Sequence, residues 1–146
     1  MRRGGGAVRR RRAGARLVAA VAVLAAIGVA CSSSGPKQGT PVAVTLDEYT
    51  IDPVPASVPA GAVTFDVLNI GGESHNLLVI RTDLEPGGLP ITGSVASEEG
   101  TVGRTDVLAT DAGQSVTVDL QAGHYVLICN VPEHYGAGMY TGFTIT

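Results

Sequence analysis

Four side chains that bind soft transition metals lie at a suggestive spacing in this sequence. Cys129, His134 and Met139 follow one another at intervals of five residues, and His75 lies upstream at the start of an expected strand. A thiolate, two imidazoles and a thioether are the donor set of a trigonal His₂Cys copper site with a weak axial Met. Soft thiolate and thioether ligands suit copper, and imidazole binds both of its oxidation states. The pattern therefore predicts one copper ion held by these four side chains.

Each of these residues taken alone has an ordinary structural explanation. Cys129 ends an apolar strand and would by itself be an inert core thiol, while His75 would be a turn residue and Met139 core filler. Zinc is the competing metal, because it takes Cys and His readily, but it rarely takes a thioether. The combination at this spacing favours a metal site, and the single thiolate with Met favours copper.

The same spacing indicates which elements must hold the ligands. Cys129 ends one expected strand and Met139 begins the next, so the loop between them can fold over a metal and turn His134 inward. The Pro and Gly residues of this loop suit tight backbone turns. His75 must then come from a neighbouring strand.

Short alternating runs separated by Gly and Pro fill the chain from residue 41 onward. The expected strands cover residues 42–46, 63–67, 75–80, 115–120, 125–129 and 139–146, with a brief strand at 107–108. A Pro-rich bend is expected at 53–59. Residues 81–103 are expected to form a long irregular surface excursion, which leaves room for a short strand or a helical turn. No stretch after residue 31 sustains helical periodicity, so the pattern predicts an all-β fold, an antiparallel sandwich or a small barrel.

The ligand loop and its flanking strands resemble the cupredoxins, the type 1 blue copper proteins. The resemblance rests on Cys-x4-His-x4-Met after the aromatic strand of residues 122–129, on Ser74-His75-Asn76 and on the turn of residues 58–61. The longer loop is most similar to that of the rusticyanin, sulfocyanin and auracyanin group. The resemblance implies a Greek-key antiparallel β-sandwich, one type 1 copper and electron transfer through the exposed edge of His134. It also implies that the Asn76 side chain braces the ligand loop.

Acidic and basic residues are segregated along the 146 residues, so the formal net charge of −3 conceals two different regions. Seven of the ten basic residues fall within the first sixteen positions, and all thirteen acids lie from Asp47 onward. From Cys31 to the end, three basic and thirteen acidic residues leave a balance of −10. This charge would repel phosphate, so we expect no nucleic-acid partner. Glu98 and Glu99 are expected to form a solvated surface that could steer a basic redox partner.

Residues 1–30 have the pattern of a secretory signal peptide. An Arg-rich start precedes an uncharged apolar run over 17–29, which ends in small residues. As a helix this run would span roughly 20 Å, shorter than a hydrocarbon core of about 30 Å. The alternatives are a buried core helix or a short membrane anchor.

The segment Gly28-Val29-Ala30-Cys31 resembles the lipobox of bacterial lipoproteins, although Gly28 stands where that family usually has Leu. The resemblance implies acyl chains on Cys31 that anchor the protein to the outer face of the cytoplasmic membrane. The alternative is ordinary cleavage near Ala30, which leaves Cys31 a free thiol. Residues 31–41 are then a flexible tether and residues 42–146 the cupredoxin-like domain.

These patterns predict a monomeric, membrane-tethered electron carrier that cycles Cu(II)/Cu(I) between redox proteins such as a respiratory complex or an oxidase. The alternative is a copper-handling lipoprotein that delivers or sequesters the metal. An enzyme is disfavoured, because multicopper enzymes need further His clusters and only His124 is spare, expected on the surface. Tyr135, Ala137 and Tyr140 are expected either to form an apolar docking patch around His134 or to pack within the loop.

Overall fold

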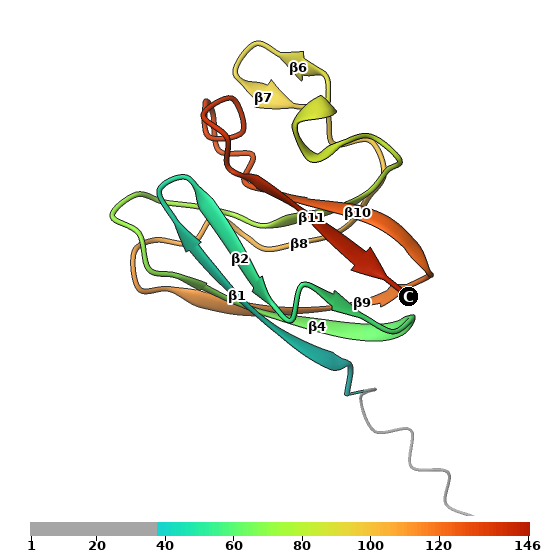
Figure 1. Ribbon diagram of the computed structural model, residues 1–146. Helices are drawn as coiled ribbons and strands as arrows, with labels where there is room; N and C mark the ends of the chain where they lie inside the picture. Colours follow the sequence, from blue (N-terminus) through green and yellow to red (C-terminus); the bar gives the residue numbers. More distant parts are fainter. Residues whose placement is uncertain (1–37) are drawn as a thin grey trace, which may run out of the picture. The chain divides into compact units, whose positions relative to one another are not determined.

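The computed structural model describes residues 38–146, which form two facing β-sheets (Figure 1). The first sheet has the order β2-β1-β4-β9 and contains β1 (Thr40–Asp47), β2 (Thr50–Val54), β4 (Gly61–Asn69) and β9 (Gly113–Leu120). The second has the order β3-β11-β10-β5-β8 and contains β3 (Ser57–Val58), β5 (Leu78–Arg81), β8 (Thr101–Arg104), β10 (Gly123–Ile128) and β11 (Tyr140–Ile145). The expected signal peptide, Cys31 and most of the expected tether lie outside the described residues.

Alternation along the strands places apolar side chains between the two sheets, as the sequence predicts. Val63, Phe65 and Val67 of β4 are buried against Tyr125 and Leu127 of β10. At the centre, the rings of Phe65 and Phe143 meet edge-to-face, with their centroids 5.4 Å apart. Apolar burial on this scale is the main stabilising contribution to such a domain.

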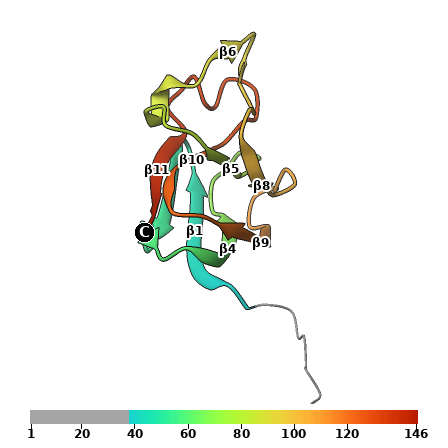
Figure 2. The ribbon, with the colours of Figure 1, turned by 90° about the vertical axis from the view of Figure 1, so that its right-hand side faces the viewer.

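The connection between β5 and β8 covers the outer face of the second sheet. It contains a 3₁₀ turn, η1 (Pro86–Gly88), and a small hairpin of β6 (Ile91–Thr92) and β7 (Val95–Ala96). Leu89 and Ala96 from this connection pack with Val126 and Ile128 of β10, so both faces of β10 are buried. Figure 2 shows the hairpin above the sandwich, beside the loop that joins β10 to β11.

Two features of the sheets differ from the sequence-based expectation. The sandwich is not wholly antiparallel, because β1 pairs parallel to β4 and β3 pairs parallel to β11. Alternation records which face of a strand is buried but not the direction of its neighbour, so the sequence pattern could not reveal these pairings. The second difference is β2, which occupies part of the expected bend. It is an edge strand, where the missing N–H of Pro53 is tolerated.

Several strands end or begin together at one side of the sandwich, which we call the ligand end. Here β1, β4 and β10 finish, and β5, β9 and β11 begin, as their pairing registers show. The loops that follow β4 and β10 therefore meet at this end. Within residues 38–146, no helix is long and apolar enough to cross a membrane.

Candidate metal centre

Three of the four predicted ligands converge at the ligand end. The Cys129 Sγ lies 3.8 Å from His75 Nδ1 and 3.5 Å from His134 Nδ1, and the two Nδ1 atoms are 3.1 Å apart. Metal bonds to such donors are about 2.0–2.3 Å long for an ion like zinc, so one ion can reach all three atoms. His75 and Cys129 are fully buried, and His134 is 7% exposed.

Met139 is fully buried in the same core cluster as Cys129. The Cys129 N–H donates to the Met139 carbonyl at 3.1 Å, and the Met139 N–H donates to the His134 carbonyl at 3.0 Å. These bonds close the ligand loop at its base. A thiolate and two imidazoles, with a buried thioether in the same core cluster, make a soft donor set that fits copper better than a hard cation.

The backbone around His75 is held from both sides. His75 forms an isolated bridge with Leu108, in which each N–H donates to the other residue's carbonyl at 3.0 and 2.7 Å. The buried Asn69 side chain supports this bridge, since its Nδ2 donates to the carbonyls of Glu73 and Leu108. Its Oδ1 accepts the Gly71 N–H. The short segment before His75 is therefore ordered although it has no regular structure.

Asn76 joins the two halves of the site. Its side-chain Oδ1 accepts the Asn130 N–H at 2.8 Å, at the start of the ligand loop. Its backbone N–H points at the Cys129 Sγ at 3.5 Å. One residue thus positions the start of the ligand loop and donates toward the sulfur, and hydrogen bonding around this sulfur is known to tune such sites.

Asn130 is a supporting residue that the sequence reasoning missed. Its side chain bonds both the N–H and the carbonyl of Ala96, at 2.8 and 3.1 Å, and donates to Glu98 Oε1 at 3.0 Å. Glu98 also pairs with Arg104. The Asn130 contact, followed by Arg104, lowers the pKa of Glu98. Asn130 therefore ties the ligand loop to β7, and Glu98 links it to Arg104 of β8 rather than being only a solvated charge.

The buried thiol favours its protonated form in the absence of a metal. Burial raises the pKa of Cys129, and the backbone N–H groups of Asn76 and Val131 oppose this rise. Only the thiolate is a ligand, so a bound cation must displace the proton.

Two carboxylates that the sequence reasoning did not single out face the outer nitrogens of the histidines. Glu48 Oε1 lies 3.5 Å from His75 Nε2, and Glu73 Oε2 lies 3.2 Å from His134 Nε2. Glu48 comes from the β1–β2 turn, far from His75 in the chain, and no spacing signal links the two. Tyr49 from the same turn lies edge-on to His134, with ring centroids 5.3 Å apart.

Tyr135 does not form a surface docking patch. It is 2% exposed, its hydroxyl donates to the Pro86 carbonyl, and it accepts the Leu89 N–H. Tyr140 packs against it with ring centroids 5.0 Å apart. The alternative of ordinary loop packing is therefore correct for Tyr135, because its ring fills the space under the β5–β8 connection.

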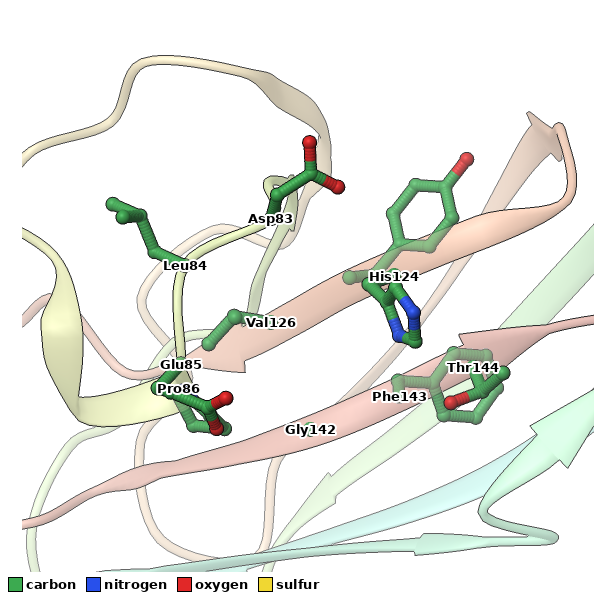
Figure 3. Close-up of a pocket in the computed structure, with 10 residues that line it drawn as sticks. Asp83, Leu84, Glu85, Pro86, His124, Val126, Gly142, Phe143 and Thr144 are labelled. Atoms are coloured by element: carbon green, nitrogen blue, oxygen red, sulfur yellow. The ribbon is translucent and has the colours of Figure 1, made fainter.

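His124 lies on the surface and away from the three converging donors, as expected from alternation along β10. It borders a shallow hollow of about 380 Å³ on the outer face of the second sheet, together with Asp83 and Gly142 (Figure 3). None of the four predicted ligands lines this hollow.

Similar folds are found among solved structures. Reduced auracyanin from Roseiflexus castenholzii is 19% identical with a TM-score of 0.57, and the match covers 74% of this chain and 98% of that one. Auracyanin B is 25% identical with a TM-score of 0.57, covering 77% and 91%. Rusticyanin from Thiobacillus ferrooxidans is 16% identical with a TM-score of 0.57, covering 75% and 79%. No protein-family model and no curated protein matches the chain.

Residues 38–146 therefore have the fold of the cupredoxins, the type 1 blue copper proteins, which confirms the prediction from the ligand loop. Within that class, auracyanin and rusticyanin belong to the group that the long loop indicated. The cluster of His75, Cys129, His134 and Met139 fits one type 1 copper ion.

Proposed function

We propose that this protein is a one-electron carrier whose copper is held by His75, Cys129, His134 and Met139. The observation that carries the proposal is the convergence of two Nδ1 atoms and one Sγ within 3.8 Å of one another at a buried position. Copper in such a site supplies a Cu(II)/Cu(I) couple. The chain's own contribution is a closed network of backbone and Asn76 contacts that keeps the donors in one arrangement, so little rearrangement accompanies a change of charge.

His134 is the ligand through which a partner would exchange electrons. His75, Cys129 and Met139 are fully buried, whereas His134 retains a 7% exposed edge. The partner is a redox protein with a basic docking face, such as a respiratory complex or an oxidase. The support is charge, since Arg81 and Arg104 are the only Lys or Arg residues in 38–146, against thirteen acids. Opposite charges accelerate such encounters.

The carrier works as a monomer on the outer face of the cytoplasmic membrane, tethered through a lipidated Cys31. This part of the proposal rests on the sequence alone, on the signal-like residues 1–30 and the lipobox-like segment before Cys31. Membrane fractionation of the natural protein and of Cys31→Ser tests it. Equal membrane association of both forms would contradict the lipid anchor.

Spectroelectrochemical cycling distinguishes an electron carrier from a copper-handling protein. The copper-loaded protein is cycled repeatedly in the presence of a high-affinity Cu(I) chelator, while the visible band and the bound copper are followed. A carrier keeps one copper per chain and recovers its full band after each cycle, because its ligands are buried. A copper-handling protein would lose Cu(I) to the chelator during the reduced phase.

A further inference from the structure

Both ligand histidines present their outer nitrogen to a carboxylate. His75 Nε2 faces Glu48 Oε1 at 3.5 Å, and His134 Nε2 faces Glu73 Oε2 at 3.2 Å. The two carboxylates are themselves linked, since Glu48 Oε1 accepts the Glu73 backbone N–H at 2.7 Å. This N–H holds the Glu48 carboxylate beside the His75 ring.

His75 Nε2 is a fully buried nitrogen that makes no complete hydrogen bond among the described residues. When Nδ1 binds a metal, the proton must sit on Nε2, and a buried N–H without an acceptor is costly. The Glu48 carboxylate is the acceptor within reach, and histidines bound to metals commonly donate to such a carboxylate.

Gly71 makes this approach possible. A Cβ atom at position 71 would lie 2.7 Å from Glu48 Oε1 and 3.0 Å from His75 Nε2, so any side chain there would enter the space between them. The Glu48 carboxylate is the end of a flexible side chain and could move aside, whereas the His75 ring is packed on all sides. Absence of a side chain at Gly71 therefore preserves the pair.

We propose that Glu48 and Glu73 are positioning residues that orient both imidazoles with Nδ1 toward the copper and lower its reduction potential. This inference rests on the proposed function. A carboxylate beside an imidazole N–H raises the electron-donating power of the ligand and stabilises the more positive ion, Cu(II), over Cu(I). Glu48 has the larger effect, because its side chain is 31% exposed and faces a buried ring, whereas Glu73 is 54% exposed.

The test compares the midpoint potentials of Glu48→Gln, Glu73→Gln and the control Glu133→Gln at pH 7. Glu133 neighbours His134 in the same loop, but within residues 38–146 its side chain forms no hydrogen bond or ion pair with either histidine. Gln at position 48 keeps an oxygen for the Glu73 N–H and loses only the charge. We expect Glu48→Gln to lower the ratio of the protein's affinity for Cu(II) to its affinity for Cu(I) about tenfold. For a one-electron couple this corresponds to a rise in the midpoint potential of about 59 mV. Glu73→Gln should lower this affinity ratio about threefold and Glu133→Gln less than twofold.

Gly71→Ala provides a second variant that leaves every charge in place. It should raise the potential as Glu48→Gln does, because its methyl group displaces the Glu48 carboxylate. The Nε2–H signal of His75 in the Zn(II)-loaded protein gives a readout without copper. It should be protected from solvent exchange in the natural protein and in Glu48→Gln, whose amide oxygen can still accept this N–H, and less protected in Gly71→Ala, whose methyl group displaces the acceptor.

Shifts in Glu48→Gln and Gly71→Ala no larger than that in Glu133→Gln would overturn the inference, as would a fall in potential. If the protein forms a blue copper complex but Glu48→Gln and Gly71→Ala leave its midpoint potential unchanged, only the positioning role is refuted. A protein that never forms a blue copper complex refutes the proposed function, and this inference with it.

Discussion

The interior of the sandwich and its ligand end bury different kinds of side chain. Between the sheets, the buried residues are apolar, with Phe65 and Phe143 at the centre. All the buried polar residues of the described chain lie at the ligand end, and they are Asn69, His75, Thr105, Asn130 and His134. Burying polar groups is costly unless they are paired, so their concentration marks the region that the fold maintains for chemistry rather than for stability.

Because the interior is apolar and the ligand end holds the buried polar residues, we expect mutations in the two regions to have different effects. Packing defects in the interior should reduce stability and leave the copper signature unchanged. Changes at the ligand end should alter the copper signature at little cost to the fold. The following predictions test this separation, from the largest expected effect to the smallest.

Cys129→Ser should abolish the visible charge-transfer band completely, because a serine hydroxyl does not supply a thiolate. The variant should still fold, since the replaced atom is similar in size. Absorption of the protein with one equivalent of Cu(II) measures the band, and circular dichroism measures folding. Cys31→Ser is the matched control and should keep the full band. Retention of the band in Cys129→Ser would remove Cys129 from the site.

Phe65→Ala should lower the free energy of unfolding by about 3–5 kcal/mol, because it empties the centre of the apolar core. Denaturant unfolding of the metal-free protein measures this loss. In the fraction that remains folded, the copper band should be unchanged. A folded Phe65→Ala protein without the band would show that the two regions are not separable.

Met139→Leu should keep copper bound and raise the midpoint potential. Leu fills the buried space of Met139 but removes the sulfur, which is the expected axial donor. Loss of a donor destabilises the more positive Cu(II) more than Cu(I), so the potential rises. We expect a change of about tenfold in the Cu(II)/Cu(I) affinity ratio, or about 59 mV. Protein-film voltammetry gives the value directly. An unchanged midpoint would mean that Met139 is not an axial ligand.

Glu98→Gln should have the smallest effect, a loss of less than about 1 kcal/mol, because its side chain is 46% exposed. The pKa of Glu98 is lowered in the folded protein, so its contribution is present above its usual value near 4.5 and is lost as the pH falls through the lowered value. The difference in unfolding free energy between Glu98→Gln and the natural protein should therefore be largest at pH 7 and should shrink as the pH is lowered below 4.5. Glu99→Gln should match the natural protein throughout this pH range, and a loss equal to that of Glu98→Gln would contradict the specific anchor.

The interior of the sandwich could be predicted from the sequence, whereas much of the ligand end could not. Alternation in β4, β9 and β10 predicted the sandwich, because burial on one face leaves a period of two in the chain. The spacing of Cys129, His134 and Met139 predicted the ligand loop, because these residues lie on one short segment. The parallel pairing of β1 with β4 left no such signal.

The residues that support the ligands could not be predicted from the sequence either. Glu48 reaches His75 from a turn far away in the chain. Asn130 binds Ala96 inside the 81–103 excursion, where the sequence did not locate a particular strand or hairpin. Such contacts depend on how loops fold in three dimensions, and no period or motif records them. Asn76 was anticipated only through the family resemblance.

The crystal structure of the copper-loaded protein tests the central claim most directly. We predict one copper per chain, bound by His75 Nδ1, Cys129 Sγ and His134 Nδ1, with the Met139 sulfur at a longer distance along the axis. A copper ion bound elsewhere, or bound through the Nε2 atoms that face Glu48 and Glu73, would contradict it.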